Sequence, residues 1–423
     1  MKFKTSLILL VAALVTIGMS GVAFAFHNGG VAACESCHTM HNSKDGKVMS
    51  RVTNTVVTNN LVIGQAGSFL LQGTDQSSTC LNCHGVNEPV GKSYHVLSLA
   101  QTVPTERTPG GDFAWLKKSS KKGHSIIAAD YGLTVETTKT GNVAPGSDTV
   151  GYPVGSLHCS SCHDPHGKYR KLSTGGFGTS GESIASSGSY GVDPTNGEAV
   201  GSYRLLGGIN YLPKSMAAFP TLAFSENPMS AAAPNTYNAT EAVNEIVVNY
   251  GDSSVGMSCQ QCHPKMHMSG IAINVHPNDQ AVGSTIAGIY NSYVKTGLTD
   301  GSAGSGYTSL VPVAYDNINQ NSQLAGHFVT GAQIAQSDRV MCLSCHRAHA
   351  SGFDYMLRFP IVEVMTTEDA GQPTYWAGGT KAADVSTVSG LTVAELQAAL
   401  YDRPATKFAI EQRTLCNKCH NKD

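Results

Sequence analysis

The cysteines of this sequence all lie in one kind of motif. The chain has 12 Cys, and every one belongs to a Cys-x-x-Cys pair that is followed directly by His. In this arrangement two thiols can add to the two vinyl groups of one porphyrin, and the His can bind the iron from one side. We therefore expect six covalent haem c groups. The attachment residues are Cys34, Cys37, Cys80, Cys83, Cys159, Cys162, Cys259, Cys262, Cys342, Cys345, Cys416 and Cys419, and the proximal iron ligands are His38, His84, His163, His263, His346 and His420.

Zinc binding and disulfide bonding are the alternative interpretations of these thiols. Two Cys-x-x-Cys pairs can hold a tetrahedral zinc ion, but such a site does not require a His after each pair. An even number of Cys in an exported chain would ordinarily suggest disulfides. The motif spacing accounts for all 12 thiols, however, and therefore favours haem.

The remaining histidines are numerous enough to give every haem a second axial ligand. The chain has 16 His, so ten lie outside the motifs, and six haems with His on both faces would use six of them. The 12 Met are the alternative axial ligands. We favour as distal ligands His41, His27, His95, His124, His327 and His166, followed by His349, His158, His276 and His267.

The spacing of several distal ligands indicates that the haems lie close together. His41, His166 and His349 each follow a motif His by three residues, and His267 follows one by four. On a helix, side chains at these separations lie on one face, so both cannot bind opposite faces of one porphyrin. The same limit applies to His158, which directly precedes a motif. Any of these that binds iron must therefore serve a neighbouring haem.

Two of the favoured distal ligands follow a glycine. His124 comes after Gly123, and His327 comes after Gly326. Because Gly has no side chain, we expect the backbone to approach the macrocycle closely at these two points.

The N-terminus predicts a cleaved signal peptide over residues 1–25. Lys2 and Lys4 precede an apolar run at 7–15, and Ala23 and Ala25 form a small-x-small cleavage site. The run is too short for an uncleaved anchor, and no later segment approaches the roughly 20 apolar residues of a membrane span. The mature chain, residues 26–423, is therefore expected to be exported, with no membrane span.

The composition excludes other classes of protein. Lys and Arg total 28 and Asp and Glu total 30, so the chain lacks the basic character of a nucleic-acid-binding protein. Hydrophobic residues make up 41% and charged residues 14%, which argues against bulk disorder.

Few regular elements are expected to position the motifs. Thr392 and Glu395 form a capping box ahead of an apolar run, and Pro404 ends the predicted helix. Residues 285–295 and 241–249 are further predicted helices, whereas the Gly- and Ser-rich segments 173–191 and 299–308 are predicted loops.

The predicted fold class is mostly irregular coil with short α-helices and little β-structure, threaded around a continuous chain of haems. Each haem has only about 66 residues of mature chain, so the porphyrins should supply most of the buried apolar surface. The motifs are unevenly spaced, so we expect no solenoid and a single unit over residues 26–423.

Four segments of the sequence resemble a known family. They are 26–41, which contains the first motif and His41, the segment 157–170 around the third motif, 342–354 at the fifth, and 415–420 at the sixth. The number and order of the motifs also match. The chain thus resembles the OmcS-type extracellular hexahaem cytochromes of Geobacter-type bacteria, which polymerise into nanowires.

The resemblance implies a haem chain that alternates between parallel-stacked and T-shaped contacts. It implies head-to-tail joining of copies of this chain, in which His41 leaves its own subunit and binds the haem held by Cys342, Cys345 and His346 of the next. Further implied partners are other multihaem cytochromes and extracellular electron acceptors such as metal oxides or electrodes. The implied location is the outer cell surface.

Two other functions compete with a conductive filament. A periplasmic or outer-surface electron shuttle would have the same haems without polymerisation. A multihaem nitrite- or hydroxylamine-type reductase would need one haem with an open face. Because all six motifs end in His and the spare His outnumber the haems, electron transfer without catalysis is the expected function.

Overall fold

The fold is a computed structural model, and its regular elements are short. It describes the following residues: 34–39, 43–44, 47–48, 56–58, 61–63, 68–86, 95–99, 110–136, 143–147, 151–165, 171–172, 199–200, 206–207, 211–224, 250–251, 259–266, 278, 280–293, 313–315, 334–361, 390–400, 415–416 and 419–420.

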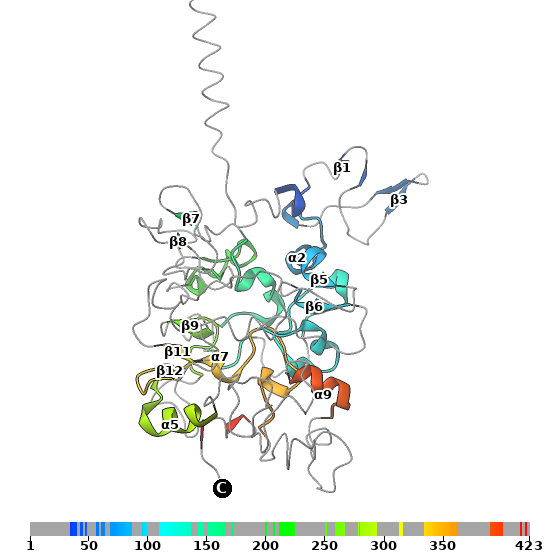
Figure 1. The fold of residues 1–423 in the computed structure, drawn as a ribbon. Coiled ribbons are helices and arrows are strands. Elements are labelled where there is room, and N and C mark those ends of the chain that lie inside the picture. The colour runs from blue at the N-terminus through cyan, green and yellow to red at the C-terminus, as the bar shows by residue number, and fades with distance from the viewer. Residues whose placement is uncertain are drawn as a thin grey trace, which may run out of the picture.

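Short helices separated by irregular chain dominate the described part (Figure 1). The α-helices are α2 (Gln76–His84), α5 (Gly283–Tyr293), α7 (Cys342–Cys345) and α9 (Val393–Ala399). The 3-10 helices are η2 (Cys34–Ser36), η3 (Ser68–Leu70), η4 (Phe113–Lys117), η5 (Ser120–Lys122), η6 (Ala129–Tyr131), η7 (Val154–Ser156), η8 (Cys159–Ser161), η10 (Lys214–Met216), η11 (Pro220–Leu222) and η12 (Asp354–Met356). The predicted fold class is confirmed.

The strands are two or three residues long. Antiparallel pairs are β1 (Ser43–Lys44) with β2 (Lys47–Val48), β3 (Val56–Thr58) with β4 (Leu61–Ile63), and β7 (Lys171–Leu172) with β8 (Ala199–Val200). A parallel pair joins β5 (Gly85–Val86) to β6 (Leu97–Ser98). A four-stranded sheet has the order β10 (Gln280–Ala281), β12 (Arg339–Val340), β11 (Ala314–Tyr315) and β9 (Tyr250–Gly251).

Two of the predicted helices are confirmed. In α9 the Thr392 hydroxyl accepts a hydrogen bond from the Glu395 backbone N–H, and the Glu395 carboxylate accepts one from the Thr392 N–H. Helix α5 covers most of the predicted 285–295 segment. The predicted helix at 241–249 and the predicted loops at 173–191 and 299–308 lie outside the described residues.

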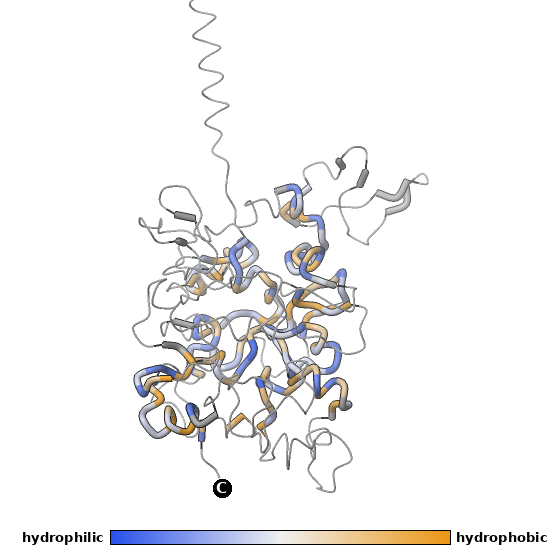
Figure 2. The backbone as a smooth tube through the Cα atoms, viewed as in Figure 1, coloured by the Kyte–Doolittle hydropathy of each residue, from blue (hydrophilic) through white to orange (hydrophobic). Residues whose placement is uncertain are grey.

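Buried apolar side chains gather in two clusters. Hydrophobic and hydrophilic positions are interspersed along the described parts of the backbone (Figure 2). A first cluster contains Leu81 of α2 and Leu97 of β6. A second contains Leu396 of α9 and Tyr290 of α5. Helix η4 lies between them, because Phe113 belongs to the first cluster and Trp115 to the second. The chain therefore has more protein core than its length per haem predicted.

Within the described residues, no helix is both long enough and apolar enough to cross a membrane.

Candidate functional site

The described haem motifs share one backbone turn. The His backbone N–H donates to the carbonyl of the first Cys at 3.0 Å in four motifs: His163 to Cys159, His263 to Cys259, His346 to Cys342, and His420 to Cys416. The second motif forms the last turn of α2. Such a turn brings both thiols and the imidazole to the same side of the chain, as haem attachment requires.

A second feature recurs at the first, third and fifth motifs. In each, a leucine from a later segment forms a β-bridge with the motif His; the pairs are His38 with Leu71, His163 with Leu206, and His346 with Leu357. The residue after that leucine then donates its backbone N–H to the carbonyl of the second Cys, at 2.8–2.9 Å, from Gln72 to Cys37, Gly207 to Cys162, and Arg358 to Cys345. The odd-numbered motifs are thus structural repeats of one another.

The His rings of three motifs are oriented by backbone carbonyls. The Nδ1 atom lies 3.1 Å from the Phe69 carbonyl oxygen in His38, 2.8 Å from that of Pro145 in His263, and 2.7 Å from that of Tyr355 in His346. A protonated Nδ1 that donates to a carbonyl leaves Nε2 as the metal-binding nitrogen. These rings are therefore set in the tautomer that iron needs.

The carbonyls at the first and fifth motifs come from unusual backbone positions. Phe69 and Tyr355 have φ of 60° and 61°, the left-handed region that non-glycine residues rarely adopt. Both side chains are exposed, while their carbonyls point to the proximal His. The sequence shows no signal for this arrangement.

Two of the distal ligands predicted from sequence have the same ring orientation. His124 Nδ1 lies 2.7 Å from the Ala348 carbonyl oxygen, and His158 Nδ1 lies 3.2 Å from that of Ile127. Burial lowers the pKa of His158, although Asp75 and the Ile127 carbonyl oppose that shift. The neutral imidazole that results is the form that binds metal.

Two pairs of His rings face each other at the separation expected across an iron. The ring centres of His124 and His263 are 6.1 Å apart, and those of His163 and His349 are 6.2 Å apart. With metal–nitrogen bonds of about 2.0–2.1 Å and roughly 1.1 Å from each nitrogen to its ring centre, two axial imidazoles would lie about 6.3 Å apart. Each pair joins one motif His to one spare His, so the residues present fit a bis-His haem.

The helical spacing argument proves wrong for the fifth motif. Helix α7 ends at Cys345, and His346 has extended backbone with φ −112° and ψ 152°, so His346 and His349 do not share a helix face. His349 nevertheless lies beside His163 of the third motif, so it does approach a different haem site. His346 and His349 are directed to different haem sites because the backbone at His346 is extended, and not because they lie on one helix face.

Gly123 lies where two chain segments meet. A Cβ atom there would lie 2.5 Å from the Ala350 Cβ and 2.8 Å from the His349 carbonyl oxygen. The His124 backbone N–H donates to that same carbonyl at 2.9 Å. Gly123 thus lets two chain segments touch, a role that the sequence did not indicate.

The thiols place consecutive motifs next to each other. A hydrogen bond to Cys159, then burial, raises the pKa of Cys80, and Cys37 also raises it. Burial followed by the electrostatic effect of Cys162 raises the pKa of Cys262. Cys37 and Cys80 place the first motif next to the second, and Cys80 and Cys159 place the second next to the third. Cys162 and Cys262 place the third next to the fourth.

Consecutive motifs also lie next to each other in the second half of the chain. A hydrogen bond to Cys342, then burial, raises the pKa of Cys259. Burial raises the pKa of Cys345 to about 11, Arg358 opposes this, and Cys416 adds to it. The fourth motif therefore adjoins the fifth and the fifth adjoins the sixth, so the motifs form a row in sequence order.

The remaining predicted ligands fall into two groups. His95 is half-buried and directly precedes Val96, whose N–H donates to the His84 carbonyl at 2.8 Å. Six lie outside the described residues: His27, His41, His166, His267, His276 and His327. Among the described residues, no three His, Cys, Asp or Glu side chains converge as a metal-ion site.

Paired thiols on single turns, oriented imidazoles and a row of such motifs define a multihaem c-type cytochrome. No protein-family model matches the chain. It is 44% identical to the C-type cytochrome OmcS of Geobacter sulfurreducens, over the full length of both chains. The chain belongs to the OmcS family of c-type cytochromes, which are electron-transfer proteins and not enzymes.

Two solved structures agree with this assignment. One is the Outer Membrane Cytochrome S filament from Geobacter sulfurreducens, with a TM-score of 0.70, and the other is a cryo-EM structure of the OmcS nanowires, with a TM-score of 0.71. Each is 42% identical to this chain, and the match covers 94% of this chain and 100% of the other.

Proposed function

We propose that this protein carries electrons outside the cell through six bis-His haem c groups in one row, and that its copies join head to tail into a conductive filament. Two observations carry the proposal: two pairs of His rings lie 6.1 and 6.2 Å apart, and the Ser77 hydroxyl of α2, the helix of the second motif, accepts the Cys159 N–H of the third motif at 3.0 Å. When bound, haem supplies the one-electron chemistry of its iron. The chain spaces the haems, orients the imidazoles and fills both axial positions.

The ring pairs support axial positions that are closed to substrates. His124 with His263, and His163 with His349, leave no open side on the haems of the fourth and third motifs. A closed iron can accept and pass electrons but cannot bind nitrite or hydroxylamine. Two His ligands also favour a lower potential than a Met/His pair. We therefore rank His349 with the favoured distal ligands, beside His124.

The repeat of the odd-numbered motifs supports ligation between subunits. His349 follows its motif His by three residues and reaches the third motif, two places back along the row. His166 holds the same position after the third motif, so it is expected to serve the first. His41 holds that position after the first motif, and two places back from there lies the fifth motif of another copy.

An iron–His bond across that boundary would join identical subunits in an open series. A head-to-tail contact that does not close into a ring produces a filament. The OmcS relatives are themselves described as filaments and nanowires, which supports the same assembly here. A filament of this kind belongs at the outer cell surface, where metal oxides, electrodes or other multihaem cytochromes can take up the electrons.

Mass and ligand-binding spectra test the haem assignment. The intact mature protein is expected to carry six haems by mass, and its reduced spectrum is expected to stay unchanged under CO. A CO-induced shift in the wild-type protein would indicate an open haem and favour a reductase. Fewer than six haems would contradict the proposed row.

A further inference from the structure

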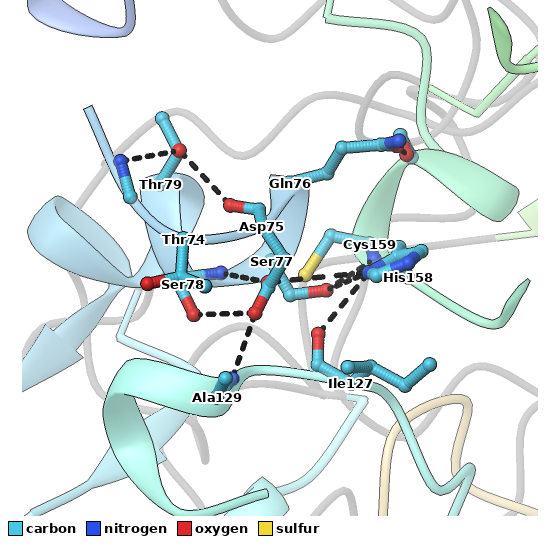
Figure 3. Close-up of polar contacts among 12 residues, drawn as sticks. Thr74, Asp75, Gln76, Ser77, Ser78, Thr79, Ile127, Ala129, His158 and Cys159 are labelled. Carbon is cyan, nitrogen blue, oxygen red and sulfur yellow. Dashed lines mark hydrogen bonds and ion pairs between the residues drawn. The ribbon is translucent and has the colours of Figure 1, made fainter. Parts of the chain in front are cut away.

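Asp75 joins the second and third haem motifs through one half-buried carboxylate (Figure 3). It precedes α2 and accepts hydrogen bonds from the Ser78 backbone N–H at 2.7 Å and the Ser78 hydroxyl at 2.9 Å. It also accepts the Ala129 N–H at 2.7 Å. Three donors from two segments hold the carboxylate in place.

The same carboxylate faces His158. Its Oδ1 atom is 4.0 Å from His158 Nδ1, and the two side chains are only 13% and 12% exposed, respectively. Ser77 Oγ lies 3.4 Å from that Nδ1 and accepts the Cys159 N–H at 3.0 Å. The Ser77 hydroxyl, the Asp75 carboxylate and the Ile127 carbonyl thus converge on His158 Nδ1 (Figure 3).

A carboxylate close to the outer nitrogen of an axial imidazole acts on the metal beyond it. It makes the ligand more basic, and its negative charge stabilises the oxidised iron, which carries one more positive charge than the reduced iron. Partial burial weakens solvent screening of this effect. The potential of such a haem is therefore lower than it would be without the carboxylate.

We propose that the charge of Asp75 lowers the reduction potential of the haem that His158 binds. The proposal rests on the proposed function, because it takes His158 to be an iron ligand. Asp75 would then set a difference in reduction potential at the junction between the second and third motifs. Asp75 itself lies outside every Cys-x-x-Cys-His motif.

The test is a spectroelectrochemical titration of the full-length haem-loaded protein and its Asp75→Asn variant. Asn caps a helix about as well as Asp, so α2 should form while the charge is lost. We expect the midpoint potential of one haem to rise, with the other five unchanged, and the low-spin EPR signal of one haem to shift. Asp75→Glu keeps the charge and should restore the potential.

Two control variants distinguish the effect of the Asp75 charge on His158 from a general disturbance of the surrounding structure. Ser77→Ala removes a neutral contact to His158 and Cys159. Asp130→Asn removes a carboxylate that accepts the Thr74 N–H at 3.0 Å and is not among the contacts of His158 described above. Neither should reproduce the upward shift.

An unchanged potential in Asp75→Asn, or an equal shift in Asp130→Asn, overturns the inference while six CO-insensitive haems in the same samples still support the proposed function. Conversely, CO binding or missing haems in the wild-type protein indicate failure of the proposed function itself.

Discussion

At the scale of single residues, the sequence identifies the attachment chemistry but not the partner of each imidazole. The Cys-x-x-Cys-His spacing follows from porphyrin geometry, so it is visible without a fold. The pairing of His163 with His349 depends instead on contacts between segments far apart in the chain. The carbonyl contacts from Phe69 and Tyr355 could not be predicted either, because any residue has a carbonyl and only the backbone angle aims it.

The ring pairs predict the result of removing one distal ligand. His349→Ala should open one haem in six, so CO should bind to about one-sixth of the haem and a high-spin signal should appear in the ferric spectrum. The covalent haem count should stay the same, because the thioether bonds do not involve His349.

The matched control is Phe113→Leu, since the Phe113 ring stacks on His349 at 4.8 Å without belonging to a haem motif. It should leave CO binding undetectable. A His349→Ala protein that ignores CO would contradict the assignment of His349 to the third motif.

Gly123 predicts a combined loss of stability and ligation. Gly123→Ala would force a Cβ against Ala350 and the His349 carbonyl, and overpacking of this kind costs about 1–3 kcal/mol. Because His124 and His349 lie on the two touching segments, the variant should also show a high-spin haem fraction. Thermal unfolding and ferric spectra measure both effects. Gly155→Ala, where a Cβ meets nothing within 4 Å, should change neither.

At the scale of elements, a local capping signal predicted helix α9, whereas the Asp75 cap of α2 was not recognised from the sequence. Helix α9 was visible because Thr392 and Glu395 stand three residues apart before an apolar run. The leucines that bridge to the odd-numbered motif His were not visible, since the connecting segments differ in length at each repeat and no periodicity marks them. The sequence therefore did not predict which distant segments pair with the motifs.

The cap of α9 predicts a pH dependence of its stability. Burial disfavours the Glu395 carboxylate, but the ion pair with Lys118 and the hydrogen bonds with Thr392 outweigh it, so its pKa is lowered from 4.5. A lowered folded-state pKa contributes stability above pH 4.5 that is lost as the pH falls through the folded value.

Hydrogen exchange of α9 at pH 7 and at decreasing pH should show its protection falling below about pH 4.5. In Glu395→Gln this acid-dependent part should be absent. Thr392→Ala should lower the stability of the helix by about 1 kcal/mol at every pH. An acid response that persists unchanged in Glu395→Gln would rule out this explanation.

At the scale of the whole molecule, motifs that are unevenly spaced in the sequence lie next to one another in space. Each motif adjoins the next through its thiols, and the odd-numbered motifs share one set of contacts. Two apolar clusters with η4 between them support the row. The sequence predicted a coil-rich chain threaded around haems, but not these clusters, because their members come from segments far apart along the chain.

The repeat predicts that polymerisation depends on one histidine. His41→Ala should keep six haems by mass and lose long filaments, because the subunit boundary would lack its iron–His bond. A haem count below six in this variant would point to misfolding, and normal filaments would show that His41 is not the intersubunit ligand.

The most direct test of the account is electron microscopy of the haem-staining fraction sheared from cells that produce this protein. The account predicts continuous filaments with a regular subunit repeat and an unbroken row of haems from one subunit into the next. Discrete particles alone, with all six haems attached, would contradict the filament and leave a soluble electron shuttle as the function.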